Sequence, residues 1–297
     1  MELIQEWPMS KSVFVFDLEF IGDVRNLKTC KIWEIAIYSL STQQWFEAVI
    51  DPDPNAQTFP EPPIPEIPKL ERQFLNDTMA QTWDVVFEQI KHWVKLQSMG
   101  AWPVFISHNT FRADKPIMEL ECKRYKKLLP TNWYFFDSLH FSRRVLKNSS
   151  GNYSLSGLHQ LLLNSAIPNA HRARADVVAC IKIMTKITDG TWKLEGPIYP
   201  AYATALRTIR WIGQKAEEIL YSKNIRSVES LYTIILENSR KYAQMSATGQ
   251  QYFEICAMET LNNIIGTNLP PDNIRNIAHV IAESPNMLSY TFMSCSI

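Results

Sequence analysis

The pattern of apolar positions is most regular near the start of the chain, where an unbroken apolar run from Val13 ends in two acidic residues. β-Branched and aromatic residues dominate the run and neither Gly nor Pro interrupts it, which predicts a strand. Because residues two apart point to the same side of a strand, Asp17 and Glu19 share the face of Val15. The opposite face carries Phe14, Phe16 and Leu18. Both faces are apolar for most of the run, which is typical of a central strand.

Further apolar patterns predict strands that alternate with helices. Alternation over 31–40 and 44–50 predicts two more strands, antiparallel because the connections are short. Two further strands are predicted at 104–106 and 133–136. Apolar residues at helical spacing predict helices at 82–97, 113–127, 137–145, 155–163 and 173–187. This order favours an α/β fold with a mixed sheet flanked by helices.

Two segments interrupt the pattern. Residues 51–68 hold seven prolines, which favours a surface connector over a ligand for a partner domain. Residues 190–200, with their glycines and prolines, indicate a domain boundary. Beyond them, 203–294 has helical periodicity and no convincing strand. We therefore expect two domains, 1–195 and an all-helical 196–297.

Composition narrows the class of protein without identifying it. The chain has 297 residues, 46% of them apolar and 20% charged, which excludes general disorder. The formal net charge is zero, so no global field argues for nucleic acid or membrane. Five scattered cysteines form no Cys-x-x-Cys pair, which favours a reducing compartment over a disulfide framework or a zinc site. With no membrane-spanning run or signal peptide, we expect a soluble intracellular protein.

Two further acids occupy positions like those of the first pair. Asp114 follows the strand at 104–106 and opens a helix, and Asp176 leads into another helix, with His171 shortly before it. Strand ends in open α/β sheets meet at one edge, where ligands usually bind. Three acidic elements beside a histidine suit two divalent cations, and oxygen ligands favour Mg²⁺ or Mn²⁺.

Each of these residues also has a simpler explanation. A pair of carboxylates two residues apart can face solvent at a strand end. Asp114 and Asp176 could be early-helix acids favoured by the macrodipole, and His171 could cap a turn. The order in which all of them occur is harder to explain in this way.

In their order and spacing these residues resemble the motifs of the DEDDh, or DnaQ-like, 3′–5′ exonucleases. Asp17-Leu18-Glu19 matches the first motif. The stretch from Asn109 to Asp114 resembles the second, with the spacing of the Trex-type repair exonucleases, although Ala113 replaces the usual aromatic residue. The other matching stretches are Ile32–Ala36, Tyr153–Leu158 and His171-x-Ala-x-x-Asp176, the last being the most specific. The resemblance covers about residues 12–187.

The resemblance implies a ribonuclease H-like fold and a two-metal mechanism. It implies hydrolysis at the free 3′ end of a nucleic acid, with DNA favoured over RNA and nucleoside 5′-monophosphates as products. Two Mg²⁺ ions, for which Mn²⁺ can substitute, would be held by Asp17, Glu19, Asp114 and Asp176. One ion would favour deprotonation of a water and the other would stabilise the leaving oxygen.

It also implies roles for four other residues. His171 would be the general base, since imidazole exchanges a proton near neutral pH. Phe20, Ile21 and Asn109 would hold the terminal nucleotide by stacking, wedging and hydrogen bonding, although Phe20 could equally belong to the core.

Basic residues outnumber acidic ones between residues 139 and 195. They are Arg143, Arg144, Lys147, Arg172, Arg174, Lys182, Lys186 and Lys193, against Asp176, Asp189 and Glu195. Such a cluster could contact phosphates, and solvated helix faces often have the same composition.

The stretch 206–231 of the helical tail is similar to a helix-hairpin-helix module, in which glycines let backbone N–H groups approach a DNA phosphate. Gly213 matches that motif and Lys215 could add a phosphate contact, whereas Trp211 stands where the first glycine is usual. A plain helical pair that stabilises the catalytic domain or meets a protein is an equally good interpretation. For the whole chain, the alternative to an enzyme is a non-catalytic nucleic-acid or protein-binding module that retains the exonuclease fold.

Overall fold

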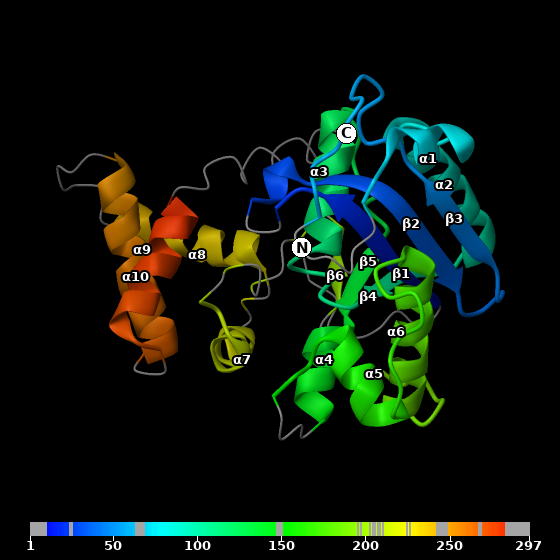
Figure 1. Cartoon of the computed structure of the whole chain (residues 1–297). Coiled ribbons are helices and arrows are strands. Elements are labelled where there is room, and N and C mark those ends of the chain that lie inside the picture. Colours follow the sequence, from blue (N-terminus) through cyan, green and yellow to red (C-terminus); the bar gives the residue numbers. More distant parts are fainter. Residues whose placement is uncertain are drawn as a thin grey trace. The chain divides into compact units, whose positions relative to one another are not determined.

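The chain folds into two compact units, Met1–Ala201 and Tyr202–Ile297, each described here by itself (Figure 1). The computed structural model describes residues 11–23, 26–62, 69–146, 151–194, 196, 198–201, 203, 206, 209, 211–223, 225, 227–241, 249–266 and 269–282. Lys147 and Glu195 of the basic segment, and Arg207, Thr208, Arg210 and Arg226 of the tail motif, lie outside these residues. Within them, no helix is both long and apolar enough to cross a bilayer.

The first unit is built on a six-stranded sheet with the strand order β3-β2-β1-β4-β5-β6. Its strands are β1 (Lys11–Ile21), β2 (Lys31–Ser39), β3 (Trp45–Val49), β4 (Trp102–Ser107), β5 (Tyr134–Asp137) and β6 (Tyr199–Pro200). β1 lies inside the sheet, antiparallel to β2 and parallel to β4. β5 is parallel to β4, whereas β3 and β6 are antiparallel to their neighbours. The predicted mixed sheet is therefore confirmed.

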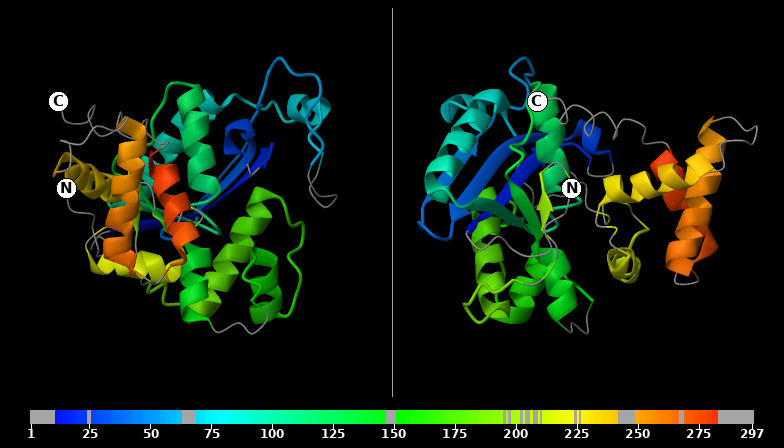
Figure 2. Two further views of the ribbon diagram at one scale, coloured as in Figure 1. Left: turned by 90° about the vertical axis from the view of Figure 1, so that its left-hand side faces the viewer. Right: turned by 180° about the vertical axis from the view of Figure 1, so that it is seen from behind.

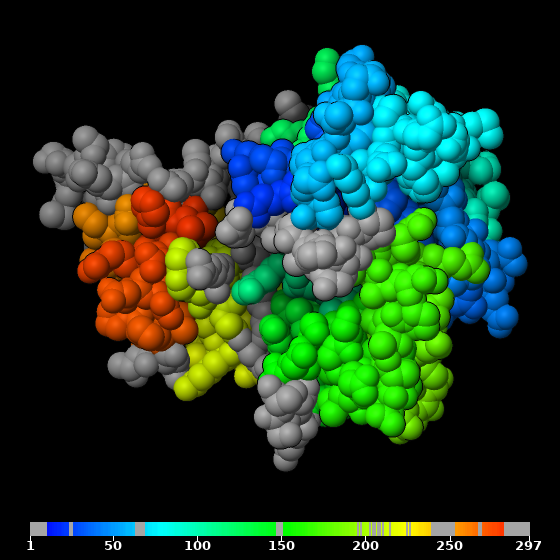
Figure 3. Space-filling model, in the orientation of Figure 1, coloured from blue at the N-terminus to red at the C-terminus, as the bar shows by residue number. Residues whose placement is uncertain are grey.

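Helices cover both faces of this sheet. They are α1 (Arg72–Asp77), α2 (Trp83–Ser98), α3 (Asp114–Arg124), α4 (Ser138–Val145), α5 (Leu155–Leu163) and α6 (Ala173–Ile187), with a short η1 (Leu27–Thr29). α4, α5 and α6, in green, lie on one side of the strands and α2 on the other (Figures 1 and 2). In the space-filling view the residues of α4 to α6, in green, lie at the surface of the first unit (Figure 3).

The two faces of β1 have the residues that its alternation predicts. Val15 is fully buried in one cluster with Ala36 of β2 and Val177 and Cys180 of α6. Phe14 and Phe16 point the other way, where Phe105 lies 5.4 Å from the ring of Phe14 and 5.7 Å from that of Phe16. Asp17 and Glu19 therefore extend the α6 side of the strand.

One irregularity interrupts the pairing of β1 with β2. Glu19 pairs with Glu34, but the next residue, Phe20, pairs with Ile32, so Trp33 is an extra residue in β2. Such a β-bulge changes the direction of the side chains around it and is common beside functional sites.

The C-terminal end of the first unit differs from the prediction. Tyr199–Pro200 forms the edge strand β6 against β5, inside a stretch that we expected to be only a boundary. α1, which follows the proline-rich stretch, was not predicted either.

In the described residues of the second unit, the regular elements are all helices. It consists of α7 (Gln214–Ser222), α8 (Val228–Lys241), α9 (Gly249–Ile265) and α10 (Pro271–Ala282). Its core includes Leu206, Ile212, Leu220, Leu231, Leu261 and Ile277. Gly213 directly precedes α7 and Lys215 lies in its first turn, and both residues are exposed.

Candidate active site

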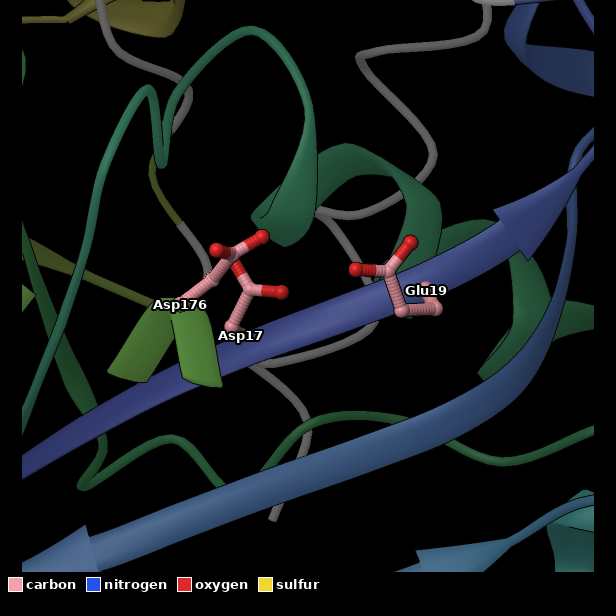
Figure 4. Close-up of side chains that lie close together, drawn as sticks. All are labelled: Asp17, Glu19 and Asp176. Carbon is pink, nitrogen blue, oxygen red and sulfur yellow. The ribbon is translucent and has the colours of Figure 1, made fainter. Parts of the chain in front are cut away.

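Three of the predicted acids meet where β1 passes the start of α6. Asp17 and Glu19 come from β1, and Asp176 comes from the first turn of α6. One carboxylate oxygen of each lies within 4.8 Å of the others. Figure 4 shows the carboxyl groups of Asp17 and Asp176 side by side, with that of Glu19 turned towards them. Among the described residues, this is the group whose spacing suits a metal ion.

Asp114 lies beside this group as the first residue of α3, and it is only 4% exposed. The Ser107 hydroxyl donates to its Oδ2 at 2.8 Å. A hydrogen bond from the backbone of Leu18, between the two acids of β1, also reaches it. After burial, the charge of Asp114 is the largest cause of the raised pKa of Asp17.

Burial raises the pKa of all four carboxyl groups, and repulsion within the group adds to the rise for Asp17 and Glu19. The pKa of Asp17 lies well above its ordinary value, first because of desolvation and then because of Asp114 and Glu19. Desolvation and the charge of Asp176 raise the pKa of Glu19 to about 8. The pKa of Asp114 rises to about 7, mainly through burial, although the Ser107 hydrogen bond lowers it. Burial also raises the pKa of Asp176, against the hydrogen bond from His171.

These four residues fit a divalent metal ion. Like charges held together out of water are unfavourable unless a cation or protons neutralise them. Carboxylate oxygens are the ligands that hard cations such as Mg²⁺ and Mn²⁺ prefer.

His171 lies at the entrance to α6, partly exposed, with a left-handed backbone at φ 65°. Its backbone N–H donates to Oδ2 of Asp176 at 3.2 Å. Its imidazole is also close enough to lower the pKa of Asp176. The histidine predicted as a base is therefore adjacent to the acidic group.

The loop that leads to Asp114 is held by polar side chains. The buried Thr110 hydroxyl donates to the backbone oxygen of Phe136 at 2.8 Å. Asp137 accepts from the backbone N–H of Phe111 at 3.1 Å and from Leu139 at 2.9 Å, which starts α4. His108 contacts the Tyr153 backbone oxygen at 2.8 Å, and burial lowers its pKa to about 4, so it is neutral near pH 7.

Sequence reasoning gave no role to Asp137 or Glu34, both of which are buried and lie near the acids. Asp137 could have been found as an N-cap acid between an apolar strand and a helix. Glu34 had no local signal, because its partner Arg172 is 138 residues away.

The residues predicted to hold a nucleotide lie next to the acids along the chain. Phe20 and Ile21 are partly exposed at the end of β1, directly after Glu19, and Ile21 packs against a cluster around Trp33. Asn109 is partly exposed in the loop before α3, at φ 75°. Where the family has an aromatic residue before the second-motif acid, this chain has Ala113 as the N-cap of α3. The buried ring of Phe111 packs against that of Tyr199, with 4.8 Å between their centroids.

Two members of the predicted basic cluster are engaged by acids of the sheet. Arg172 binds Glu34 at 2.8 Å, and Arg174 forms an ion pair with Glu47. Arg143 lies over the ring of Tyr153, 6.0 Å from its centroid.

The mixed sheet flanked by helices, with its acidic centre on β1, has the ribonuclease H-like architecture that the resemblance predicted. The family model described as "RNase_T: Exonuclease" matches residues 14–184, more than half of the chain. The chain therefore belongs to this exonuclease family.

Solved structures of low sequence identity are similar to the chain. The nuclease domain of 3′hExo, a DEDDh family member bound to rAMP, has 13% identity and a TM-score of 0.47, covering 63% of this chain and 96% of that one. A zinc-bound complex of E. coli ExoI with single-stranded DNA has 14% identity and a TM-score of 0.49, covering 62% of this chain and 42% of that one. A search of curated proteins gave no match.

Proposed function

We propose that this nuclease is a Mg²⁺-dependent 3′–5′ exonuclease that releases nucleoside 5′-monophosphates, with DNA favoured over RNA. The observation that carries the proposal is the approach of Asp17, Glu19 and Asp176 within 4.8 Å, in a chain of the exonuclease family. We also propose that the protein is intracellular. Four buried free cysteines support this location: Cys30, Cys122, Cys180 and Cys256.

In this proposal the four acids hold two Mg²⁺ ions, and Mn²⁺ can replace them. The residues are Asp17, Glu19, Asp114 and Asp176. When bound, such ions supply positive charge to the reacting phosphate and favour deprotonation of a water. Ser107 keeps the Asp114 carboxyl oriented through its 2.8 Å hydrogen bond.

His171 accepts the proton of the attacking water. It is suited to this role because its backbone is fixed on Asp176 while its side chain stays partly exposed. Phe20 and Ile21 contact the terminal base, and Asn109 donates a hydrogen bond to the terminal nucleotide. Their exposure beside the acids supports these roles.

The direction of digestion is tested with one oligonucleotide labelled at its 5′ end or at its 3′ end. With the 5′ label, a 3′–5′ exonuclease gives a ladder of shortening products, and with the 3′ label it releases a labelled mononucleotide at once. A 3′-terminal phosphorothioate should delay both. Running single-stranded DNA, duplex DNA and RNA of one sequence side by side tests the preference for DNA.

The matched control is Asp17→Asn, which keeps the shape of the side chain and removes a ligand. The proposed enzymatic activity would be contradicted if the wild-type protein shortened no oligonucleotide end in Mg²⁺ or Mn²⁺ and bound oligonucleotide only as tightly as Asp17→Asn does. That result would favour the non-catalytic binding module.

For the helical unit Tyr202–Ile297, which is the predicted domain 196–297 without the residues around β6, we propose a helix-hairpin-helix type of contact with nucleic acid. It would then be a binding domain, and the predicted domain 1–195, extended through β6, would be the catalytic one. Two features of the described residues support it: Gly213 and Lys215 are both exposed at the start of α7. At Gly213, φ is −84° and an added Cβ would meet nothing within 4 Å, so the fold does not itself demand a glycine. Close approach of a phosphate would demand one.

Gly213→Ser tests this contact because serine is a good N-cap and should keep α7 intact. We expect unchanged thermal stability and weaker oligonucleotide binding, and Lys215→Ala should reduce the salt dependence of binding by about one unit of slope. Lys95→Ala, at an exposed lysine of α2 outside the basic segment 139–195, is the charge-matched control. Affinity and salt slope equal to wild type in both tail variants would support the plain helical pair.

A further inference from the structure

Glu34 of β2 holds the segment that carries His171 and Asp176. The guanidinium group of Arg172 donates to Glu34 through Nη2 at 2.8 Å and through Nε at 3.0 Å. The backbone N–H of Ala173 donates to the same carboxylate at 3.2 Å. The Glu34 carboxylate is buried, whereas the Arg172 side chain is 42% exposed. The hydrogen bonds between them are charge-assisted, which are the stronger kind.

The β-bulge in β2 brings a second residue to the same arginine. Neighbouring residues of a regular strand point to opposite faces. Here the extra residue, Trp33, and its neighbour Glu34 both reach Arg172, whose guanidinium lies 5.8 Å from the Trp33 ring centroid. Phe74 of α1 lies 6.0 Å from the same guanidinium and meets Trp33 edge-on. The orientation of the Arg172 guanidinium is therefore fixed by the rings of Trp33 and Phe74 as well as by the charge of Glu34.

The anchored residues are those between the candidate base and the candidate ligand. Arg172 and Ala173 follow His171 directly, and Asp176 lies one turn further into α6. The two ends of this segment are also joined directly, because the backbone N–H of His171 donates to the Asp176 carboxylate. A shift of the Arg172 backbone would move both functional side chains together.

A carboxylate at position 34 is an unfavourable choice for stability alone. Glu34 pairs with Glu19 across the strands, and its charge adds to the repulsion on Asp17, Glu19 and Asp176. Placing a fifth acid beside four others is costly unless a cation is tied to it. Arg172 provides that cation, and it also acts on Glu19 with the opposite sign.

We infer that Glu34 and Arg172 form a positioning pair, which sets His171 and Asp176 against the acids of β1. This role rests on the proposed function, because it concerns the geometry of that same reaction. Neither residue contacts the reacting atoms in this account.

The chain supplies a matched control in the neighbouring ion pair. Glu47 of β3 and Arg174 of α6 join the same sheet to the same turn of the same helix. Both side chains are about half exposed, and Arg174 lies over the ring of Trp45 at 4.3 Å. Exposed pairs of this kind contribute little, so Glu47→Gln removes one equivalent charge without releasing the segment.

The kinetic test compares Glu34→Gln, Arg172→Gln and the double variant with Glu47→Gln. Loss of a residue that supports a ligand typically costs about 10 to 100-fold in activity or metal affinity. We expect that loss in kcat with little change in KM for Glu34→Gln and for Arg172→Gln. The double variant should lose no more than either single one, because the two act as a unit. Glu47→Gln should retain the wild-type kcat.

Two readouts are independent of catalysis. In Glu34→Gln, hydrogen exchange should show loss of protection in the backbone of 171–176 while α2 and β4 keep theirs. Calorimetric titration with Mn²⁺ alone, without oligonucleotide, should show binding weaker by about 10-fold or more. If Glu34→Gln fails to fold, Arg172→Gln supplies the same measurements with Glu34 retained.

Wild-type protection of 171–176, or kcat and Mn²⁺ affinity equal to those of Glu47→Gln, would overturn the inference. A wild-type protein without exonuclease activity would instead overturn the proposed function. In that case, hydrogen exchange of 171–176 and calorimetric Mn²⁺ binding would still test whether Glu34 positions this segment.

Discussion

The two faces of β1 have opposite relations to water. On one face Phe14 and Phe16 are at most 1% exposed and pack against Phe105, so that burial of apolar surface stabilises the sheet. On the other face Asp17 and Glu19 are desolvated beside Asp114 and Asp176, and their pKa values rise as a result. Both faces belong to the same eleven-residue strand.

This difference separates the source of stability from the source of chemistry. The aromatic face gains free energy on folding and offers no reactive group. The acidic face opposes folding until protons or a cation neutralise it, which is the usual condition of groups assembled for function. Substitutions on the two faces should therefore have opposite effects on stability.

Phe16→Ala should have the largest effect on stability. Phe16 is 1% exposed and contacts both Phe105 and Phe135, at 5.7 and 6.1 Å. Removing a buried phenylalanine costs about 3–5 kcal/mol. We expect urea unfolding to show that loss, and the protein that remains folded at low temperature to keep its kcat. A loss of kcat without a loss of stability would show that the faces are not separate.

Asp17→Asn should give the opposite result. We expect kcat to fall by more than about 100-fold, beyond the loss typical of residues that only support a ligand. In EDTA the same variant should unfold at a higher temperature than wild type, because a desolvated and repelled carboxylate has been removed. Calorimetry in EDTA measures this, and a lower melting temperature would contradict our account of the acidic face.

The pH dependence of the metal-free protein should show a smaller effect of the same origin. Glu19 and Asp114 keep their protons in the folded protein up to about pH 8 and 7, whereas both are ionised in the unfolded chain. The folded state then binds more protons, so stability in EDTA should decrease as pH rises from 6.5 to 8.5. His108, whose pKa is lowered to about 4, is neutral in the folded protein over this range. In the unfolded chain it still loses a proton near pH 6.5, which opposes the decrease only at the low end of the range.

Mg²⁺ should abolish most of this decrease, since it binds only the folded arrangement. Glu19→Gln should reduce the slope and Phe16→Ala should leave it unchanged. Equal slopes in wild type and Glu19→Gln would assign the titration to groups elsewhere in the chain.

The sequence was informative where a pattern is local. The limits of α5 and α6 agree with the predicted helices at 155–163 and 173–187, because apolar spacing and the flanking polar residues act over a few turns. Asp17 and Glu19 could be placed on one face because a strand alternates strictly.

The features that were missed depend on distant parts of the chain. β6 has two residues, one of them a proline, and it exists only because β5 offers an edge. The bulge at Trp33 leaves no mark in the alternation of β2. Arg172 was indistinguishable from a phosphate-binding residue until its contact with Glu34 was known.

The acidic residues of the proposed centre are distributed along the chain in a way that affects biosynthesis. A ribosome makes β1, β2 and the start of α3 first, and His171 and Asp176 much later. A nascent chain that ends before α6 therefore has its first acids and Glu34 but nothing for them to bind or orient. Such a fragment cannot complete the centre, so nucleic acids near the translating ribosome are exposed to active enzyme only when the first unit is almost fully synthesised.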